Sequence, residues 1–213
     1  EGTLVWGLSA DVGAPSWDAS KPEHWVYASM FNGLIRYSTE TFEAEPELAS
    51  SWESSSDGLT WTFHLRDDVY WHDGQKFTAD DVKFSFDAIM NPDNPTGYHR
   101  GNFADVESID VVDDVTLNIN MLNVNYDFLP LLGDFMHIFP KHILDGVDFM
   151  NDKSFAQNPV GTGAFKFDSH LVNESYTVVA NEAYFKGAPK LKRIVFKILP
   201  DASVKVAQLR TGE

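Results

Sequence analysis

The sequence of 213 residues contains no cysteine. This absence excludes a disulfide scaffold, a zinc site with cysteine ligands and a cysteine nucleophile. Positive charge is also scarce, because 16 Lys and Arg residues stand against 32 Asp and Glu residues and give a formal net charge of −16. A chain this acidic repels phosphate backbones, so we do not expect it to bind nucleic acid. A solvated acidic surface explains the charge more simply than a cationic ligand does.

Long hydrophobic runs are absent too, since no stretch approaches the roughly 18 continuous apolar residues that a membrane helix needs. The chain does not open with a charged and then apolar leader, so we expect any signal peptide to have been removed. It ends on Gly212 and Glu213 directly after a predicted helix, and we expect a truncation there. What is present is core material, because 43% of the residues are hydrophobic and 14% are aromatic.

Alternating apolar residues predict several strands. The turn at 54–58 precedes a half-buried strand over 59–65, and we expect 69–72 to pair with that strand. Residues 106–112 and 115–119 flank the turn Asp113-Asp114 and predict a β-hairpin. Further strands are expected over 3–8, 34–37, 164–167, 175–180 and 191–199.

The clearest helix begins after Thr78, a predicted N-cap whose hydroxyl accepts from the backbone N–H of Asp80 or Asp81. Its apolar face includes Val82 and Ile89, and Asn91-Pro92 ends it. Other helices are expected over 23–31, 126–132, 140–144 and after Pro200-Asp201. Strands outnumber helices and neighbouring strands join through turns, which favours an α+β fold over a regular βαβ array.

Residue spacing reveals no metal, cofactor or catalytic site. His137 and His142 are five positions apart, with Pro140 between them, so they do not share one face of a helix as zinc-binding pairs do. The adjacent carboxylate pairs have side chains that diverge, whereas acid–base catalysis needs two carboxyl groups facing one gap. The run Gly161-Thr162-Gly163 precedes a strand rather than a helix, which favours a tight turn over a phosphate cradle.

Eight short segments in series carry a resemblance to a known family. They include Gly161-Thr162-Gly163-Ala164-Phe165, similar to the family's Gly-Thr-Gly-Pro-Tyr, with Ala164 where Pro is usual. The sequence resembles the family 5 extracellular solute-binding proteins, which are the oligopeptide, dipeptide and nickel receptors of ABC importers. The segments span 48–52, 56–69, 72–74, 78–85, 159–167, 181–187, 189–191 and 194–201.

The resemblance implies a type II periplasmic-binding-protein-like fold, in which two lobes close on a ligand. It implies that this chain is the first lobe with an inserted subdomain and that the second lobe is missing. Residues 1–38 and 158–213 would then form the core of the lobe, and 39–157 the inserted small subdomain. The implied protein is extracytoplasmic, either periplasmic or anchored to the cell surface as a lipoprotein.

The implied function is the substrate-binding component of an ABC import system that binds peptides or a similar small solute by lobe closure. It would be no enzyme, need no cofactor and no metal, act as a monomer, and have a membrane permease as its partner. Two alternatives remain open. One is a hydrolase acting on peptides or carbohydrates, and the other is a sensory or chaperone module on the same fold.

By the same resemblance, the edge of the ligand cleft comprises residues 12–25, 95–102 and 133–137. Trp25 would supply a stacking wall, and Arg100 could pair with a carboxylate of the ligand. Because only Arg100 lies near such a position, a nickel chelate is the weaker expectation. The aromatic residues near these loops fit burial under neighbouring loops equally well. The candidate ligand-binding residues are Trp17, Trp25, Tyr98, His99, Arg100, Phe135 and His137.

Overall fold

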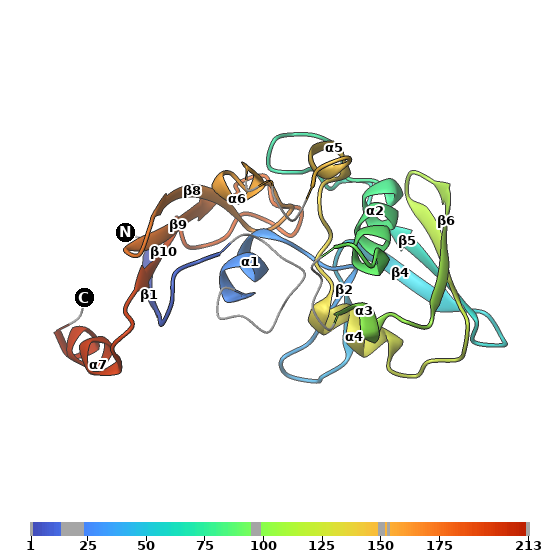
Figure 1. Cartoon of the computed structure of the whole chain (residues 1–213), viewed down its shortest axis with the longest axis horizontal. Helices are drawn as coiled ribbons and strands as arrows, with labels where there is room; N and C mark the ends of the chain where they lie inside the picture. Colours follow the sequence, from blue (N-terminus) through green and yellow to red (C-terminus); the bar gives the residue numbers. More distant parts are fainter. Residues whose placement is uncertain (1, 14–23, 95–98, 149–151, 153, 212–213) are drawn as a thin grey trace.

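Two four-stranded sheets lie at opposite ends of an elongated molecule, with helix α1 (His24–Met30) between them (Figure 1). The computed structural model describes residues 2–13, 24–94, 99–148, 152 and 154–211. Both sheets are built mainly from antiparallel neighbours and helices are short, so the predicted α+β class is confirmed.

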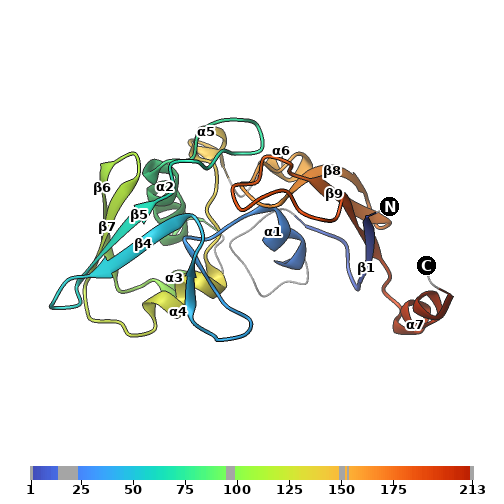
Figure 2. The ribbon, with the colours of Figure 1, turned by 180° about the vertical axis from the view of Figure 1, so that it is seen from behind.

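The first sheet joins the two ends of the chain. Its order is β1 (Thr3–Leu8), β10 (Arg193–Ile198), β9 (Ser175–Ala180) and β8 (Phe165–Leu171). β1 runs parallel to β10, with residue 3 opposite residue 193, whereas the other neighbours are antiparallel. Helix α7 (Ala202–Thr211) follows β10 and projects from this end of the molecule in both views (Figures 1 and 2).

The second sheet is antiparallel throughout and comes entirely from the middle of the chain. Its order is β4 (Ala49–Ser54), β5 (Thr60–Leu65), β7 (Thr116–Met121) and β6 (Val106–Asp113). Every second residue of β7 is buried, and α2 (Ala79–Met90) packs against β6. The predicted hairpin and the predicted helix after Thr78 are therefore confirmed.

Helix α2 begins at a capping box formed by Thr78 and Asp81. The Asp81 carboxylate accepts the backbone N–H of Thr78 at 3.0 Å and also that of Lys141 at 2.9 Å. The indole Nε1–H of Trp71 donates to the same carboxylate at 3.3 Å. Asp81 therefore joins the start of α2 to two other segments, which the sequence did not indicate.

Shorter elements connect the two sheets. The ribbon of β2 (Ile35–Tyr37) and β3 (Ala44–Pro46) is covered by α4 (Phe128–Phe135). The remaining helices are α3 (His99–Asn102), α5 (Lys141–Leu144) and α6 (Ser154–Gln157).

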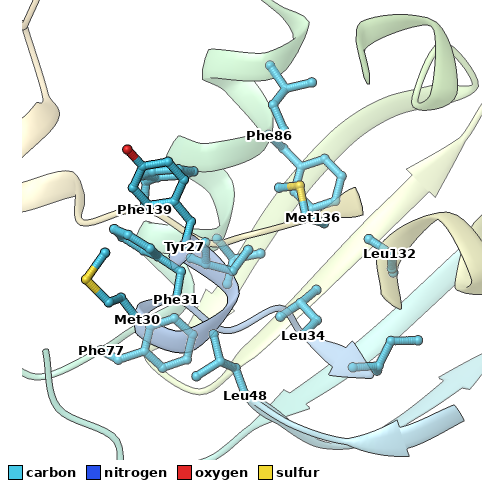
Figure 3. Close-up of a cluster of buried hydrophobic side chains, with 14 of the residues drawn as sticks. Tyr27, Met30, Phe31, Leu34, Leu48, Phe77, Phe86, Leu132, Met136 and Phe139 are labelled. Atoms are coloured by element: carbon cyan, nitrogen blue, oxygen red, sulfur yellow. The ribbon is translucent and has the colours of Figure 1, made fainter. Parts of the chain in front are cut away.

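A continuous hydrophobic core runs from α1 to α2 and the ribbon (Figure 3). Within this core, the rings of Phe31 and Phe139 have centroids 5.0 Å apart, and Leu34 and Leu48 are fully buried. Each such side chain contributes roughly 1.5–3 kcal/mol when it leaves water. The core therefore holds α1 firmly against the part of the molecule that carries the second sheet.

One predicted pairing of strands is wrong. Residues 69–72 do not pair with β5, whose neighbours are β4 and β7; instead Tyr70 forms an isolated bridge with Lys76. β4, whose segment lies directly before the 54–58 turn, occupies the position beside β5 that was expected for residues 69–72. Two further strands, β3 and β4, were not predicted from the sequence. For β3 the reason is that Glu45 and Pro46 are poor strand formers.

Candidate functional site

An exposed pair of tryptophans lies at the edge of the first sheet. Trp25 of α1 is 62% exposed and stacks on Trp6 of β1, with ring centroids 6.4 Å apart and an interplanar angle of 23°. Trp6 is 46% exposed and also contacts the buried ring of Phe196. The pair presents a flat apolar surface of the kind that binds aromatic or apolar groups.

The segment before residues 14–23 is anchored to the first sheet by Asp11. The Asp11 carboxylate accepts the ring Nε2–H of His170 and the backbone N–H of Asn173, both at 2.8 Å. Although burial opposes it, these hydrogen bonds hold the pKa of the Asp11 carboxyl below its usual value. Asp11 therefore fixes the end of this segment against β8 and the turn that follows β8.

The same segment is also tied to α1, because the Tyr27 hydroxyl donates to the carbonyl oxygen of Gly13. A hollow of about 530 Å³ opens beside it, between this segment, α6 and β8. Its lining is mostly apolar and comprises Val12, Gly13, Ala156, Gln157, Phe167, His170 and Val172.

A buried polar cluster lies just beyond the end of α1. The Asn32 side-chain amide donates to Glu47 at 2.9 Å and to the hydroxyl of Tyr184 at 3.2 Å, and its oxygen accepts the Thr162 hydroxyl at 2.9 Å. The backbone N–H of Gly33 donates to the second oxygen of Glu47 at 3.1 Å. Burial raises the pKa of the Glu47 carboxyl even though these donors oppose the shift.

The turn at Gly161-Thr162-Gly163 packs directly on the last residue of α1. The Gly163 N–H donates to the carbonyl oxygen of Met30 at 2.7 Å. A Cβ atom on Gly161 would lie 1.9 Å from that oxygen, and one on Gly163 would lie 2.5 Å from the Met30 carbonyl carbon. Both glycines are required by this close approach. The chain bends at residues 162–164 directly before β8, where the sequence predicted a tight turn.

Of the seven candidate residues, Trp17 and Tyr98 lie outside the residues that the structure describes. His99 begins α3 and Phe135 ends α4, and only their backbones are described. The role of these four residues stays a prediction.

Arg100 is engaged by the backbone that follows α2. Its guanidinium donates to the carbonyl oxygens of Ile89 at 3.3 Å, Asn91 at 2.6 Å and Asn94 at 2.8 Å. These bonds satisfy carbonyls at the end of the helix, a structural task that the sequence did not indicate. A ligand carboxylate would have to share this guanidinium, so the predicted pairing stays a prediction.

His137 lies in the stretch that connects α4 to α5. Its ring is 6.4 Å from that of Phe31, and the next residue, Ile138, donates its N–H to the carbonyl oxygen of Asn32 at 3.0 Å. Trp25, Arg100 and His137 thus have different neighbours, and α1 connects the surroundings of Trp25 to those of His137.

Two residues of this region escaped the sequence prediction. Trp6 was assigned only to a strand, although an aromatic residue beside the chain start could have drawn attention to an exposed strand edge. Asn32 lies directly after the helix predicted over 23–31, and no pattern around it indicates a buried amide with three side-chain partners.

The described part of the chain offers neither a metal centre nor a membrane span. Among these residues, no group of three or more His, Cys, Asp or Glu side chains is arranged to hold a metal ion. Within the same ranges, no helix combines the length and the apolar character needed to cross a membrane.

Comparison with known sequences gives a consistent result. A family model, described as bacterial extracellular solute-binding proteins, family 5 Middle, matches residues 43–213. The chain is 35% identical over 203 residues to the heme-binding protein A of Haemophilus influenzae, and 34% identical over 204 residues to the dipeptide-binding protein of Escherichia coli. Each match covers 86% of this chain but only 37% and 38% of these relatives, so the chain spans less than two fifths of their length.

Solved structures agree with the sequence matches. NikZ from Campylobacter jejuni in complex with Ni(L-His) superposes with a TM-score of 0.89 at 36% identity, covering 99% of this chain and 42% of that chain. The oligopeptide-binding protein AppA from Bacillus subtilis in complex with a nonapeptide gives a TM-score of 0.92 at 26% identity, with the same coverages.

Proposed function

Because this chain belongs to the bacterial extracellular solute-binding proteins of family 5, we propose that it is part of the substrate-binding component of an ABC import system. The observation that carries this proposal is the match of the family model to residues 43–213, together with superposition of 99% of the chain on ligand-bound receptors. The family expected from the sequence is thereby confirmed. The activity, ligand and partners of the whole protein are part of the proposal, since the chain spans less than two fifths of its relatives.

In this proposal, residues 1–38 and 158–213 form the core of one lobe and residues 39–157 form its inserted subdomain. The pairing of β1 with β10 supports this division, because it brings both ends of the chain into one sheet. The second sheet supports it equally, since all four of its strands lie between residues 49 and 121. The remainder of the polypeptide would supply the second lobe.

The ligand is a peptide or a similar small solute that binds between the lobes. The relatives are named for heme, dipeptides, a nonapeptide and a nickel–histidine complex, so the family accepts ligands of varied size. Trp25, stacked on Trp6, forms an apolar wall of the site on this lobe. The Asn32 cluster holds α1, and hence Trp25, in a fixed position.

The mechanism is capture and release without chemistry on the ligand. A ligand that contacts both lobes binds the closed arrangement better than the open one and shifts the population toward closure. The closed receptor then delivers its ligand to a membrane permease. In this proposal the receptor works outside the cytoplasm as a monomer, either free in the periplasm or held at the cell surface by a lipid anchor.

Calorimetry on the full-length receptor that contains this chain tests the proposal. Dipeptides, a longer peptide, heme and Ni(L-His) are titrated separately, and we expect saturable binding of at least one without turnover. Trp25→Ala should weaken that binding at least about fivefold, because an aromatic contact is worth about 1 kcal/mol beyond its buried area. Tyr126→Ala is the matched control, since Tyr126 is 92% exposed in the loop before α4.

The outcomes separate the function from the site. Cleavage of a bound peptide, or no binding of any probe, would contradict the receptor function. Binding that Trp25→Ala leaves unchanged would preserve the receptor function and remove Trp25 from the site.

A further inference from the structure

A histidine connects the loop before α2 to the turn that packs on α1. His72 lies between β5 and α2, and its backbone N–H donates to the carbonyl oxygen of Gly161 at 2.8 Å. The ring continues the contact on both sides: Nδ1 lies 3.2 Å from the backbone nitrogen of Gly161, and Nε2 lies 3.0 Å from the carbonyl oxygen of Gly163. We call these three hydrogen bonds the His72 joint.

The geometry of the joint fixes the protonation state of the ring. The Gly161 N–H can only donate, so Nδ1 must be unprotonated and accept, while Nε2 carries the proton and donates to the Gly163 carbonyl. A neutral imidazole therefore satisfies both neighbours. A protonated ring would place a second N–H against the Gly161 N–H and lose that hydrogen bond.

The titratable groups around the ring lie on β8, in the loop that carries His72, and on α5. The Lys166 ammonium of β8 donates to the His72 carbonyl oxygen at 3.5 Å, which adds positive charge next to the joint. Asp73, the next residue in the chain, is a carboxylate that acts on the ring, but it is engaged at 2.8 Å by His142 of α5. Burial, supported by Lys166, lowers the pKa of His72 to about 4, although the Gly163 carbonyl and Asp73 oppose the shift.

The Gly161-Thr162-Gly163 turn connects the His72 joint to α1. The same turn donates from the Gly163 N–H to Met30 at 2.7 Å and from the Thr162 hydroxyl to Asn32 at 2.9 Å. The two ends of the turn are therefore held by the loop before α2 on one side and by α1 on the other. Any loosening at His72 weakens the support of α1 and of Trp25, which α1 carries.

We propose that the His72 joint is a pH-sensitive connection between the loop before α2 and the Gly161-Thr162-Gly163 turn, closed at neutral pH and opened by acid. This goes beyond the proposed ligand capture, because it holds whatever the ligand is. It would make the position of α1 depend on the pH of the surrounding medium.

The direction of the pH effect follows from proton linkage. In the unfolded chain the imidazole gains a proton below about pH 6.5, whereas in the folded chain it stays neutral until about pH 4. The contribution of the joint is thus fully present above about pH 6.5. As the pH falls through this window, the folding equilibrium constant decreases by at most tenfold per pH unit, or roughly 300-fold in total.

Urea unfolding at pH 7, 6 and 5 tests the inference in the chain itself. His72→Gln removes the titrating group, so its loss of stability between pH 7 and pH 5 should be clearly smaller than that of the wild type. His64→Gln is the matched control, because His64 is exposed on β5, and it should retain the wild-type pH dependence. His142→Gln tests whether the dependence comes from the pair with Asp73 instead. Equal pH dependence in His72→Gln and the wild type would overturn the proposal.

NMR of the wild type gives an answer even where the variant fails to fold. The imidazole of His72 should show the Nε2–H tautomer, with a titration midpoint well below pH 6.5. The protection factors of the Gly161 and Gly163 amides should fall as His72 gains its proton, while that of Leu117 in β7 changes less. A midpoint near pH 6.5, or an Nδ1–H tautomer, would contradict the proposal.

Discussion

Asn32 shows how much can depend on one side chain. Its amide serves Glu47, Tyr184 and Thr162 together, so the buried Thr162 and the half-buried Glu47 and Tyr184 each have a hydrogen-bond partner. Such clusters are costly to disrupt in part, because removing one member leaves the others without compensation for lost water. The cluster therefore fixes the relative positions of the end of α1, the segment before β4 and the turn before β8.

Asn32→Ala is expected to lower the free energy of unfolding by roughly 2–3 kcal/mol, because it leaves the Glu47 carboxyl and the Thr162 hydroxyl with unsatisfied polar atoms. Chemical denaturation measures the effect. Asn123→Ala is the control, since Asn123 is exposed and donates to Asp105 at the surface. A cost for Asn32→Ala as small as that of the control would mean that water replaces the amide without loss.

Residue roles were the part of the site least accessible to sequence reasoning. Trp25 was proposed from the family resemblance, and the structure places it on an exposed edge; its ligand contact awaits the titration described above. Arg100 was proposed on the same basis, but its guanidinium is held by three backbone carbonyls that only the folded chain brings together. Hydrogen bonds between distant segments leave no local pattern, which explains why the roles of Asn32 and His72 were not predicted.

At the scale of secondary-structure elements, the start of α2 is a junction. Asp81 belongs to the capping box of α2 and also accepts from Lys141 at the start of α5 and from Trp71 in the preceding loop. Burial raises the pKa of the Asp81 carboxyl. The hydrogen bonds that it accepts from Thr78, Lys141 and Trp71 oppose this shift. One carboxylate therefore both begins a helix and attaches its neighbours.

Asp81→Ala should cost roughly 2 kcal/mol of stability, through the lost cap and the uncompensated N–H groups of Trp71 and Lys141. Asp80→Ala is the matched control one position earlier, because Asp80 makes an exposed ion pair with Lys141 at 3.4 Å, a contact of little worth. Thermal unfolding of both variants would decide the matter. Equal melting temperatures would show that Asp81 adds nothing beyond its position in the first turn.

A second prediction at this scale concerns the turn that packs on α1. Gly161→Ala is expected to lower stability by about 3 kcal/mol or more, since its Cβ would lie 1.9 Å from the Met30 carbonyl oxygen. Gly101→Ala in α3 is the control, because a Cβ added there would have no atom within 4 Å and alanine suits a helix. A well-folded Gly161→Ala protein with unchanged stability would mean that the turn can move away from α1 without cost.

Elements with a strong local pattern were predicted well from the sequence. The alternation in β5 and β7 and the capping signal at Thr78 each depend on neighbouring residues, and these elements appear where expected. The pairing of residues 69–72 with β5 was wrong, because the partner of a strand is chosen by contacts over the whole sheet. Sequence periodicity reports which face of a strand is buried but carries no information about its neighbour.

At the scale of the whole molecule, two sheets are connected through a continuous core and several buried polar contacts. The core around Phe31 and Phe139 joins α1 to the rest of the molecule, and the Asn32 cluster and the His72 joint add polar contacts near the end of α1. At this scale two predictions were confirmed: the α+β class, which came from the pattern of strands and helices, and the family, which came from the resemblance. The division into a lobe core and an inserted subdomain remains a proposal that fits the two separate sheets.

The parallel pairing of β1 with β10 sets an order for events during synthesis. Residues 49–121 contain every strand of the second sheet, so that sheet can form once this stretch has left the ribosome. Strand β1, which carries Leu4, Val5 and Trp6, has to wait until residues 193–198 emerge, so its backbone N–H and C=O groups have no strand partner during that interval. A nascent chain of this kind carries a long-lived apolar segment ahead of its folded part, which is where a chaperone would find an early binding site.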